Sequence, residues 1–229
     1  MNLRDLVLIC CIPVVLGACA GDSVLRDVTS AVYANSTGKT EDYTQNLPLV
    51  ASDYYLRVHL KGGQPTILVL GYEDHHLQGP VEVWYSAAGE VLKIQNGRIV
   101  GTAGLTSNWQ QVDISKAPFK WSGISTDVQW TRTRDESPGY KYGVSDRLVV
   151  SEWQGLPPHS ISSTLPLSVA KTYRWYVEQS SDGQFSKLPA AWFAVSSQNG
   201  VETVEYSEQC ITPDLCFSLQ RWPLKEIHP

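Results

Sequence analysis

Two carboxylates and two imidazoles stand next to one another at Glu73, Asp74, His75 and His76, in a chain that has only five histidines. Side chains of these types can bind a divalent metal ion or form an acid–base pair. Adjacent residues of an extended segment point to opposite sides, however, and the helical H-E-x-x-H spacing of metalloproteases is absent. We therefore interpret residues 73–79 as a solvated polar loop, with weak metal binding and catalysis as the less favoured alternatives.

The segments on either side of this cluster predict two β-strands that the loop connects. The stretch "ILVLGY" ends at Tyr72, and "VEVWYS" begins at Val81. Both stretches are rich in β-branched and aromatic residues, which favour strands. The Gly79-Pro80 pair before the second strand is typical of a turn. The two histidines are thus expected at a strand connection.

A β-hairpin is predicted most clearly by "EVLKIQNGRIVGT", in which Asn96-Gly97 separates two runs of alternating apolar and polar residues. Asn-Gly is the preferred pair for a two-residue hairpin turn, because both central positions need a positive φ.

Further strands are predicted at "WQQVDIS", "DRLVVSEW", "KTYRWYVEQ", "AAWFAVSS" and "CFSLQRW". A short N-terminal helix is expected over residues 22–33, where apolar side chains recur at helical spacing behind a capping Asp22 or Ser23. Because no parallel βαβ spacing is present, we predict an all-β fold of mainly antiparallel sheets. The fold would be a sandwich or a partly open barrel.

The N-terminal sequence "MNLRDLVLICCIPVVLGAC" is typical of a secretory signal, since Arg4 precedes an uncharged run over residues 6–16. That run has about half of the roughly 20 residues that a membrane-spanning helix needs. The final "LGAC" resembles the lipobox of bacterial lipoproteins, whose cysteine receives diacylglycerol before cleavage. We predict a signal peptide over residues 1–18 and acylation of Cys19, with palmitate among the expected chains. An ordinary signal peptide with a chance cysteine is the alternative.

The mature chain, residues 19–229, is expected to form a single β-rich domain. Its anchor would be sorted to the outer membrane, because Ala20 rather than aspartate follows the cysteine, and the domain would face the periplasm. The whole chain has 23 acidic and 18 basic residues, for a net charge of −5. No overall positive field therefore attracts nucleic acid.

The cysteines fit an oxidising compartment. Cys10 and Cys11 would leave with the signal peptide, so only Cys210 and Cys216 remain beside the lipidated Cys19. The intervening "ITPDL" contains a turn-forming Pro-Asp pair, which can bring the two thiols together. We predict a Cys210–Cys216 disulfide and no metal, since two thiolates would need two further zinc ligands.

Three segments carry a family resemblance: "PTILVLGYEDHHLQGPVEVWYSAAGEVLKIQNGRIVGTAGL", "TRTRDESPGYKYG" and "YSEQCITPDLCFSLQRWPLK". They resemble the YjbF/GfcB family of group 4 capsule and exopolysaccharide lipoproteins, over nearly all of the mature chain. The chain departs from the family pattern at "LPLVASDYY", and the "EDHHLQGP" loop resembles an insertion. That departure argues against a shared role for the histidines.

The resemblance implies an accessory, non-catalytic role in the assembly or export of surface polysaccharide. Export proteins or the polysaccharide itself would be the partners, and no cofactor is expected. The residues agree, because a Gly-x-Ser-x-Gly elbow and a phosphate loop are absent. Asp135-Glu136 could in principle hydrolyse a glycoside, but we interpret "TRTRDESPGY" as a charged turn beside Arg132 and Arg134.

Three residues matched to the family pattern, Arg98, Asp135 and Tyr140, are the candidates for an interaction site. Arg98 is the strongest, because a guanidinium can bind an acidic sugar or a partner carboxylate through two hydrogen bonds; pairing within the sheet is the alternative. Two other functions remain open, namely a polysaccharide-binding or glycan-processing protein and a lipid- or lipoprotein-handling module. An open groove lined by aromatic rings would favour sugar, and a closed apolar cavity would favour lipid.

Overall fold

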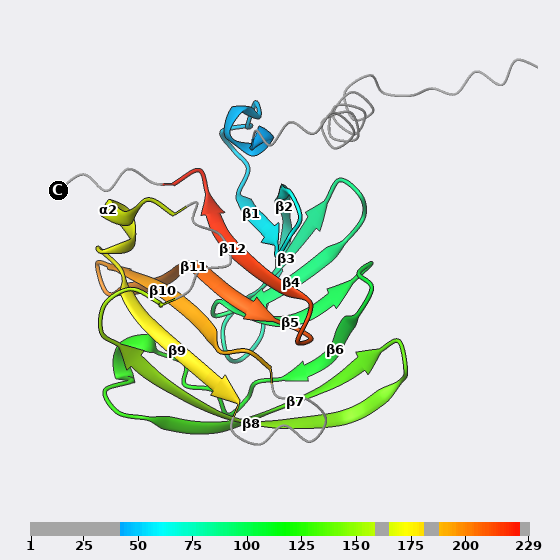
Figure 1. Ribbon diagram of the computed structural model, residues 1–229, viewed down its shortest axis with the longest axis vertical. Coiled ribbons are helices and arrows are strands. Elements are labelled where there is room, and N and C mark those ends of the chain that lie inside the picture. Colours follow the sequence, from blue (N-terminus) through cyan, green and yellow to red (C-terminus); the bar gives the residue numbers. More distant parts are fainter. Residues whose placement is uncertain (1–41, 159–164, 181–187, 225–229) are drawn as a thin grey trace, which may run out of the picture. The chain divides into compact units, whose positions relative to one another are not determined.

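In the part of the chain that the structure describes, twelve β-strands form one antiparallel sheet that curls until its two edges approach each other (Figure 1). The computed structural model describes residues 42–158, 165–180 and 188–224. Within these ranges, the prediction of a mainly antiparallel all-β fold is confirmed. The predicted signal peptide, Cys19 and the helix expected over residues 22–33 lie outside them.

The strands are β1 (Tyr55–Leu60), β2 (Pro65–Asp74), β3 (Val81–Ser86), β4 (Val91–Gln95), β5 (Arg98–Ala103), β6 (Asn108–Asp113), β7 (Val128–Ser137), β8 (Lys141–Trp153), β9 (Arg174–Ser180), β10 (Ala191–Gln198), β11 (Val201–Cys210) and β12 (Cys216–Trp222). Short helical segments accompany them: η1 (Tyr43–Asn46), η2 (Trp121–Gly123) and α2 (Leu167–Ala170). The chain runs outward from β1 to β5, crosses to β6, and returns strand by strand until β12 pairs with β1.

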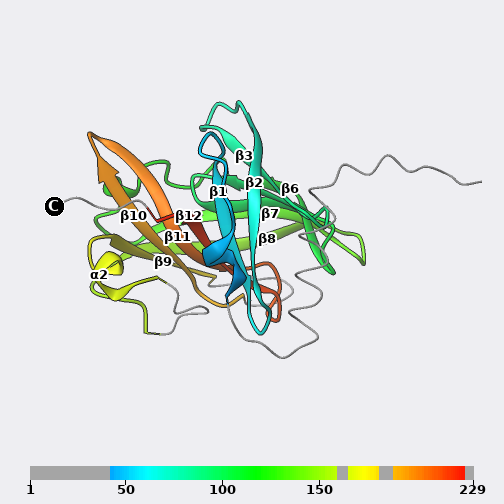
Figure 2. The ribbon, with the colours of Figure 1, turned by 90° about the horizontal axis from the view of Figure 1, so that it is seen from above.

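The two edge strands, β5 and β6, contact each other, so the sheet is nearly closed and resembles a barrel. Part of the junction is a hydrogen bond of 3.0 Å that the Trp109 backbone N–H on β6 donates to the Thr102 hydroxyl on β5. Seen from above, the strands cross over one another as they wrap the interior (Figure 2). Of the two predicted architectures, the partly open barrel describes this arrangement better than two separate sheets.

The predicted Asn96-Gly97 hairpin is confirmed between β4 and β5, with φ of 49° at Asn96 and 78° at Gly97. Glycine is needed here for a second reason. A Cβ atom added to Gly97 would lie 2.4 Å from a methyl carbon of Val204 on β11. The turn therefore packs against the opposite wall of the barrel.

All seven remaining predicted strands are confirmed, in β2, β3, β6, β8, β9, β10 and β12. Strands β1 and β11 were not predicted from the sequence. The prediction of a charged turn at "TRTRDESPGY" is wrong, because the segment is a strand for most of its length: β7 continues to Ser137, and only the tip beyond it turns. The charged side chains are compatible with a strand because their charges are paired across the sheet: Arg132 lies directly opposite Asp146 of β8 and forms an ion pair with it.

Large aromatic residues fill the barrel interior. One apolar cluster is built around Trp84, Trp109 and Phe217, and a second around Trp121, Trp130 and Phe193. A third, smaller cluster joins Trp175 and Tyr206 with the helical turn at α2 on the other face of the sheet, since Trp175 alternates with the interior residue Tyr176. Burying such side chains contributes about 1.5–3 kcal/mol for a large apolar residue. Most of the aromatic residues near the interior are thus structural.

None of the helices in the described ranges is long and apolar enough to cross a membrane.

Candidate functional site

An open cleft of about 750 Å³ lies at one end of the barrel. Its lining comes from the start of β1, the β2–β3 connection, the β4–β5 turn, the loop around η2, the β10–β11 turn and the end of β12. Because neighbouring strands are antiparallel, all of these connections and termini meet at the same end of the sheet. The volume falls within the about 300–1,000 Å³ that is common for ligand sites.

An ion pair lies on the floor of the cleft, between two strands that are not neighbours. Arg221 Nη2 on β12 lies 2.5 Å from Glu82 Oε1 on β3. The other oxygen of Glu82 accepts a hydrogen bond of 3.1 Å from the Trp84 indole N–H. The Arg221 guanidinium also lies 5.7 Å from the centre of the Trp84 ring. Carboxylate, guanidinium and indole thus fix one another across the mouth of the barrel.

One wall of the cleft is the loop around η2, which Trp121 anchors in the core. The Trp121 ring packs 5.1 Å from Tyr176 and 4.8 Å from Phe193, and its indole N–H donates to the Asn96 side-chain oxygen at 3.0 Å. Glu202 accepts two backbone N–H groups, from Trp121 at 2.9 Å and from Ser122 at 2.7 Å. The loop is therefore held in place while its exposed side chains face solvent.

Aromatic rings stand on the rim. Phe119 on the η2 loop is 54% exposed, and Tyr54 before β1 is 68% exposed. Trp222 at the end of β12 also lines the cleft and lies 5.5 Å from the Arg57 guanidinium. The exposed rings of Phe119 and Tyr54 contribute little to the core, so they are available to a ligand.

Acidic side chains line the cleft, and the protein itself occupies much of their hydrogen-bonding capacity. Two of the three carboxylates that line the cleft, Glu82 and Glu202, accept hydrogen bonds from other residues of the protein. They therefore shape the cleft. Among the described residues, no group of three or more His, Cys, Asp and Glu side chains could hold a metal ion.

Arg98, the strongest candidate from the sequence, lies inside the barrel with 2% of its surface exposed. Its Nε donates to Glu178 Oε2 at 3.0 Å, and its guanidinium lies 4.3 Å from the centre of the Trp121 ring. Its two η nitrogens have no hydrogen-bond partner among the described residues. This placement favours the alternative that Arg98 pairs within the sheet.

The other two candidates lie in the β7–β8 hairpin, away from the cleft lining. Asp135 is half-buried and accepts a hydrogen bond of 2.8 Å from the Gly143 backbone N–H. Tyr140 is 75% exposed at the hairpin tip, with a φ of 49°. The structure therefore does not bring Arg98, Asp135 and Tyr140 together.

A second charged cluster belongs to the strands of the same hairpin, on the side that is buried inside the barrel. Asp146 accepts hydrogen bonds from Arg132, at 2.6 and 3.1 Å, and from Arg134. Both guanidinium groups lie over the Trp109 ring, at 4.4 and 4.6 Å from its centre. Burial lowers the pKa of Arg132, while the negative charges of Asp146 and Glu178 act in the opposite direction. The cluster is enclosed.

The predicted histidine loop is confirmed as an exposed strand connection. β2 extends two residues further than expected, to Asp74, and His75 and His76 follow in the loop. His76 Nε2 lies 3.6 Å from Asp74 Oδ2, with both side chains more than half exposed. Solvent screens an ion pair that is so exposed, so the pair contributes little to the stability of the loop.

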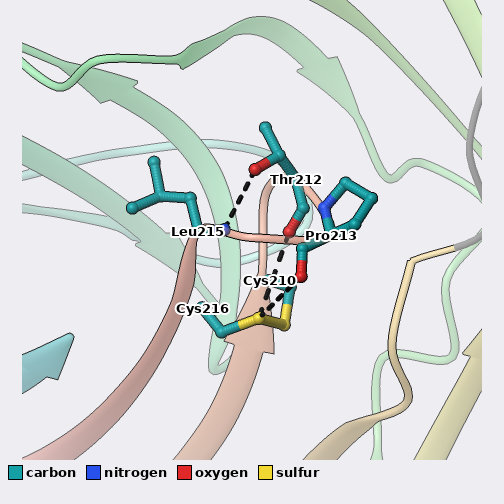
Figure 3. Close-up of a disulfide and its surroundings, with 5 residues drawn as sticks. All are labelled: Cys210, Thr212, Pro213, Leu215 and Cys216. Carbon is teal, nitrogen blue, oxygen red and sulfur yellow. Dashed lines mark hydrogen bonds between the residues drawn. A yellow bond between two sulfur atoms is a disulfide. The ribbon is translucent and has the colours of Figure 1, made fainter. Parts of the chain in front are cut away.

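The predicted Cys210–Cys216 disulfide is confirmed (Figure 3). It joins directly opposed residues of β11 and β12, at the end of the hairpin that Pro213 and Asp214 turn. Inside the closed loop, the Leu215 backbone N–H donates to the Thr212 hydroxyl at 3.0 Å (Figure 3). The loop therefore has both a covalent and a hydrogen-bonded closure.

Residues 40–218 match the family described as "Group 4 capsule polysaccharide lipoprotein gfcB, YjbF". The chain belongs to this family. The resemblance stated from the sequence is thereby confirmed. A search of curated proteins found no match.

Among solved structures, the fold is similar to the crystal structure of the hypothetical lipoprotein YmcC from Escherichia coli (K12). The TM-score is 0.57 at 17% sequence identity, over 84% of this chain and 95% of the YmcC chain. At this identity the similarity supports the fold alone.

Sequence reasoning did not find the cleft. Its residues come from six connections scattered between residues 53 and 224, and each is unremarkable by itself. The only local signals were the two turns that contribute to it, Gly79-Pro80 and Asn96-Gly97. Neither turn indicates which other segments meet it.

Proposed function

We propose that this protein is a non-catalytic lipoprotein of the outer membrane that assists the assembly or export of a capsule or exopolysaccharide. The observation that carries the proposal is the family match over residues 40–218, since that family is described as capsule polysaccharide lipoproteins. The domain would act from the periplasmic side, with export proteins or the polymer as its partners.

The anchor in this proposal is an acylated Cys19. The sequence "LGAC" at residues 16–19 supports acylation, and Ala20 supports sorting to the outer membrane. Each buried methylene group of an acyl chain contributes about 0.8 kcal/mol to membrane binding, so two or more chains hold a domain stably. The disulfide between Cys210 and Cys216 supports an oxidising compartment.

The shape of the cleft favours sugar over lipid handling. It is open to solvent and bordered by exposed aromatic rings. Three further cavities among the described residues measure about 20, 10 and 90 Å³. Each of the three is far smaller than the open cleft.

Deletion of the gene tests the role in polysaccharide production. In cells that make the polymer, deletion should reduce its amount at the surface or change its chain length, and a plasmid copy should restore both. Wild-type amount and chain length after deletion would contradict the proposal.

Cys19→Ala tests the anchor. The variant should lose the mass of the acyl chains and leave the outer-membrane fraction, while the wild-type protein stays there. A variant with unchanged mass and unchanged fractionation would show that Cys19 is not the attachment point.

A further inference from the structure

We propose that the cleft binds a short segment of an uncharged polysaccharide, with the rings of Tyr54 and Phe119 stacking on sugar faces. The class of ligand, a polysaccharide, rests on the proposed function. The site, its contact residues and the charge of the sugar go beyond that proposed function.

Shape is the first argument. A polysaccharide segment is part of a longer chain, so its site must be open to solvent for the rest of the chain to extend outside it. The cleft meets this condition, because it is built from connections at the end of the barrel and opens to solvent. A mobile polymer end could therefore enter without any strand moving apart.

The exposed rings are the second argument. Tyr54 and Phe119 come from separate segments, yet both line the same cleft with more than half of their surface in solvent. Single apolar residues on a surface need no explanation, but rings that converge on one concavity mark a binding site. The apolar face of a pyranose ring can cover an aromatic ring, and its hydroxyl groups remain free for polar partners.

Polar partners are present beside these rings. Lys120 and Ser122 are exposed on the η2 loop, and Gln78 and Thr203 lie on the β2–β3 and β10–β11 connections. Together they offer both donors and acceptors. A sugar hydroxyl is also a donor and an acceptor, so a mixed lining of this kind suits it better than it suits an acyl chain.

Charge decides between neutral and acidic sugars. The cleft lining contains three acidic residues, Asp53, Glu82 and Glu202, against two basic ones, Lys120 and Arg221. Arg221 is already paired with Glu82. A polymer with a carboxylate on each repeat would meet more negative than positive charge, which disfavours its binding. An uncharged segment meets no such repulsion.

Binding of oligosaccharides to the purified full-length protein in detergent tests the inference. The probes are oligosaccharides released from the surface polysaccharide of the producing cells by partial hydrolysis, separated by anion exchange into neutral and acidic fractions. Trp222 lines the cleft and is partly exposed, so tryptophan fluorescence should change on binding. The neutral fraction should bind the wild-type protein more tightly than the acidic fraction does.

Tyr54→Ala and Phe119→Ala should each weaken binding of the neutral fraction about tenfold, as expected for an aromatic residue that contributes strongly to binding. Both rings are exposed, so neither change opens a cavity and both variants should fold. Tyr72→Ala is the matched control, because Tyr72 is 52% exposed on β2 and does not line the cleft. It should bind like the wild type.

Three outcomes would overturn the inference: no binding of either fraction, tighter binding of the acidic fraction, or full binding by the Tyr54→Ala, Phe119→Ala double variant. Complementation separates this failure from failure of the proposed function. If gene deletion abolishes the polymer but the double variant restores it fully, the cleft is not the site and the function stands. If deletion has no effect while the purified protein binds neutral sugar through these rings, the site stands and the function fails.

Discussion

The floor of the cleft and the enclosed cluster beside β7 are built from the same three kinds of side chain. In the cleft, Arg221 pairs with Glu82 above Trp84. In the enclosed cluster, Arg132 and Arg134 share Asp146 above Trp109. The difference is solvent, because the Asp146 side chain is 1% exposed whereas Arg221 and Glu82 are 26% and 17% exposed. Identical chemistry therefore serves stability in one place and leaves an accessible polar surface in the other.

The enclosed cluster should be the more sensitive of the two. Asp146→Ala leaves the buried Arg132 guanidinium without its hydrogen-bonded carboxylate, while Arg134 keeps Glu136. The free energy of unfolding should fall by about 3–5 kcal/mol. Urea denaturation followed by tryptophan fluorescence measures the loss. If uncompensated charge is the cause, adding Arg132→Met to the variant should recover part of it. A loss below about 1 kcal/mol would mean that the cluster is not closed to water.

The disulfide should have the next largest effect. Closing a loop of about seven residues contributes about 2–2.5 kcal/mol by the chain-entropy estimate, and Cys210 and Cys216 are six positions apart. The Cys210→Ser, Cys216→Ser double variant should lose that amount relative to the oxidised wild type. Equal denaturation midpoints for the two proteins would show that the Thr212–Leu215 hydrogen bond suffices to close the loop.

At the floor of the cleft, Glu82→Gln should cost only about 0.5–1 kcal/mol, because a partly exposed ion pair is weak and the new amide oxygen can still accept from Trp84. Urea denaturation of Glu82→Gln and Asp146→Ala in the same buffer compares the two losses in the free energy of unfolding directly. Equal losses for the two variants would contradict the distinction between the regions.

The smallest effect is expected at the exposed histidines. His75→Ala combined with His76→Ala should change neither stability nor polysaccharide export, because both side chains lie in solvent at a strand connection. Export is measured in the deletion strain that carries the variant. Loss of export with a stably folded double variant would assign these histidines a function.

The sequence was informative wherever a structural feature is local. Asn96-Gly97 determines its own turn through two positive φ angles, and Cys210 and Cys216 are joined across the hairpin that the residues between them form. The alternation of apolar and polar residues located most strands for the same reason.

What the sequence could not supply is long-range pairing. Arg98 and Glu178 are 80 positions apart, and Glu82 and Arg221 are 139 apart. Their contacts depend on how the sheet curls. Arg98 was therefore open to two interpretations from the sequence, and "TRTRDESPGY" looked like a charged turn because the partner of its arginines on β8 was not apparent. Arg98, which matches the family pattern, lies in the interior, while the cleft is built from connections and strand ends.

The junction between β5 and β6 also bears on self-association of the protein. An open twelve-stranded sheet would present two long rows of backbone N–H and C=O groups, and such edges recruit strands from neighbouring molecules. Here the two edges face each other, and Trp109 donates across them to Thr102. The same curl that shapes the cleft thus also protects the molecule against edge-to-edge aggregation.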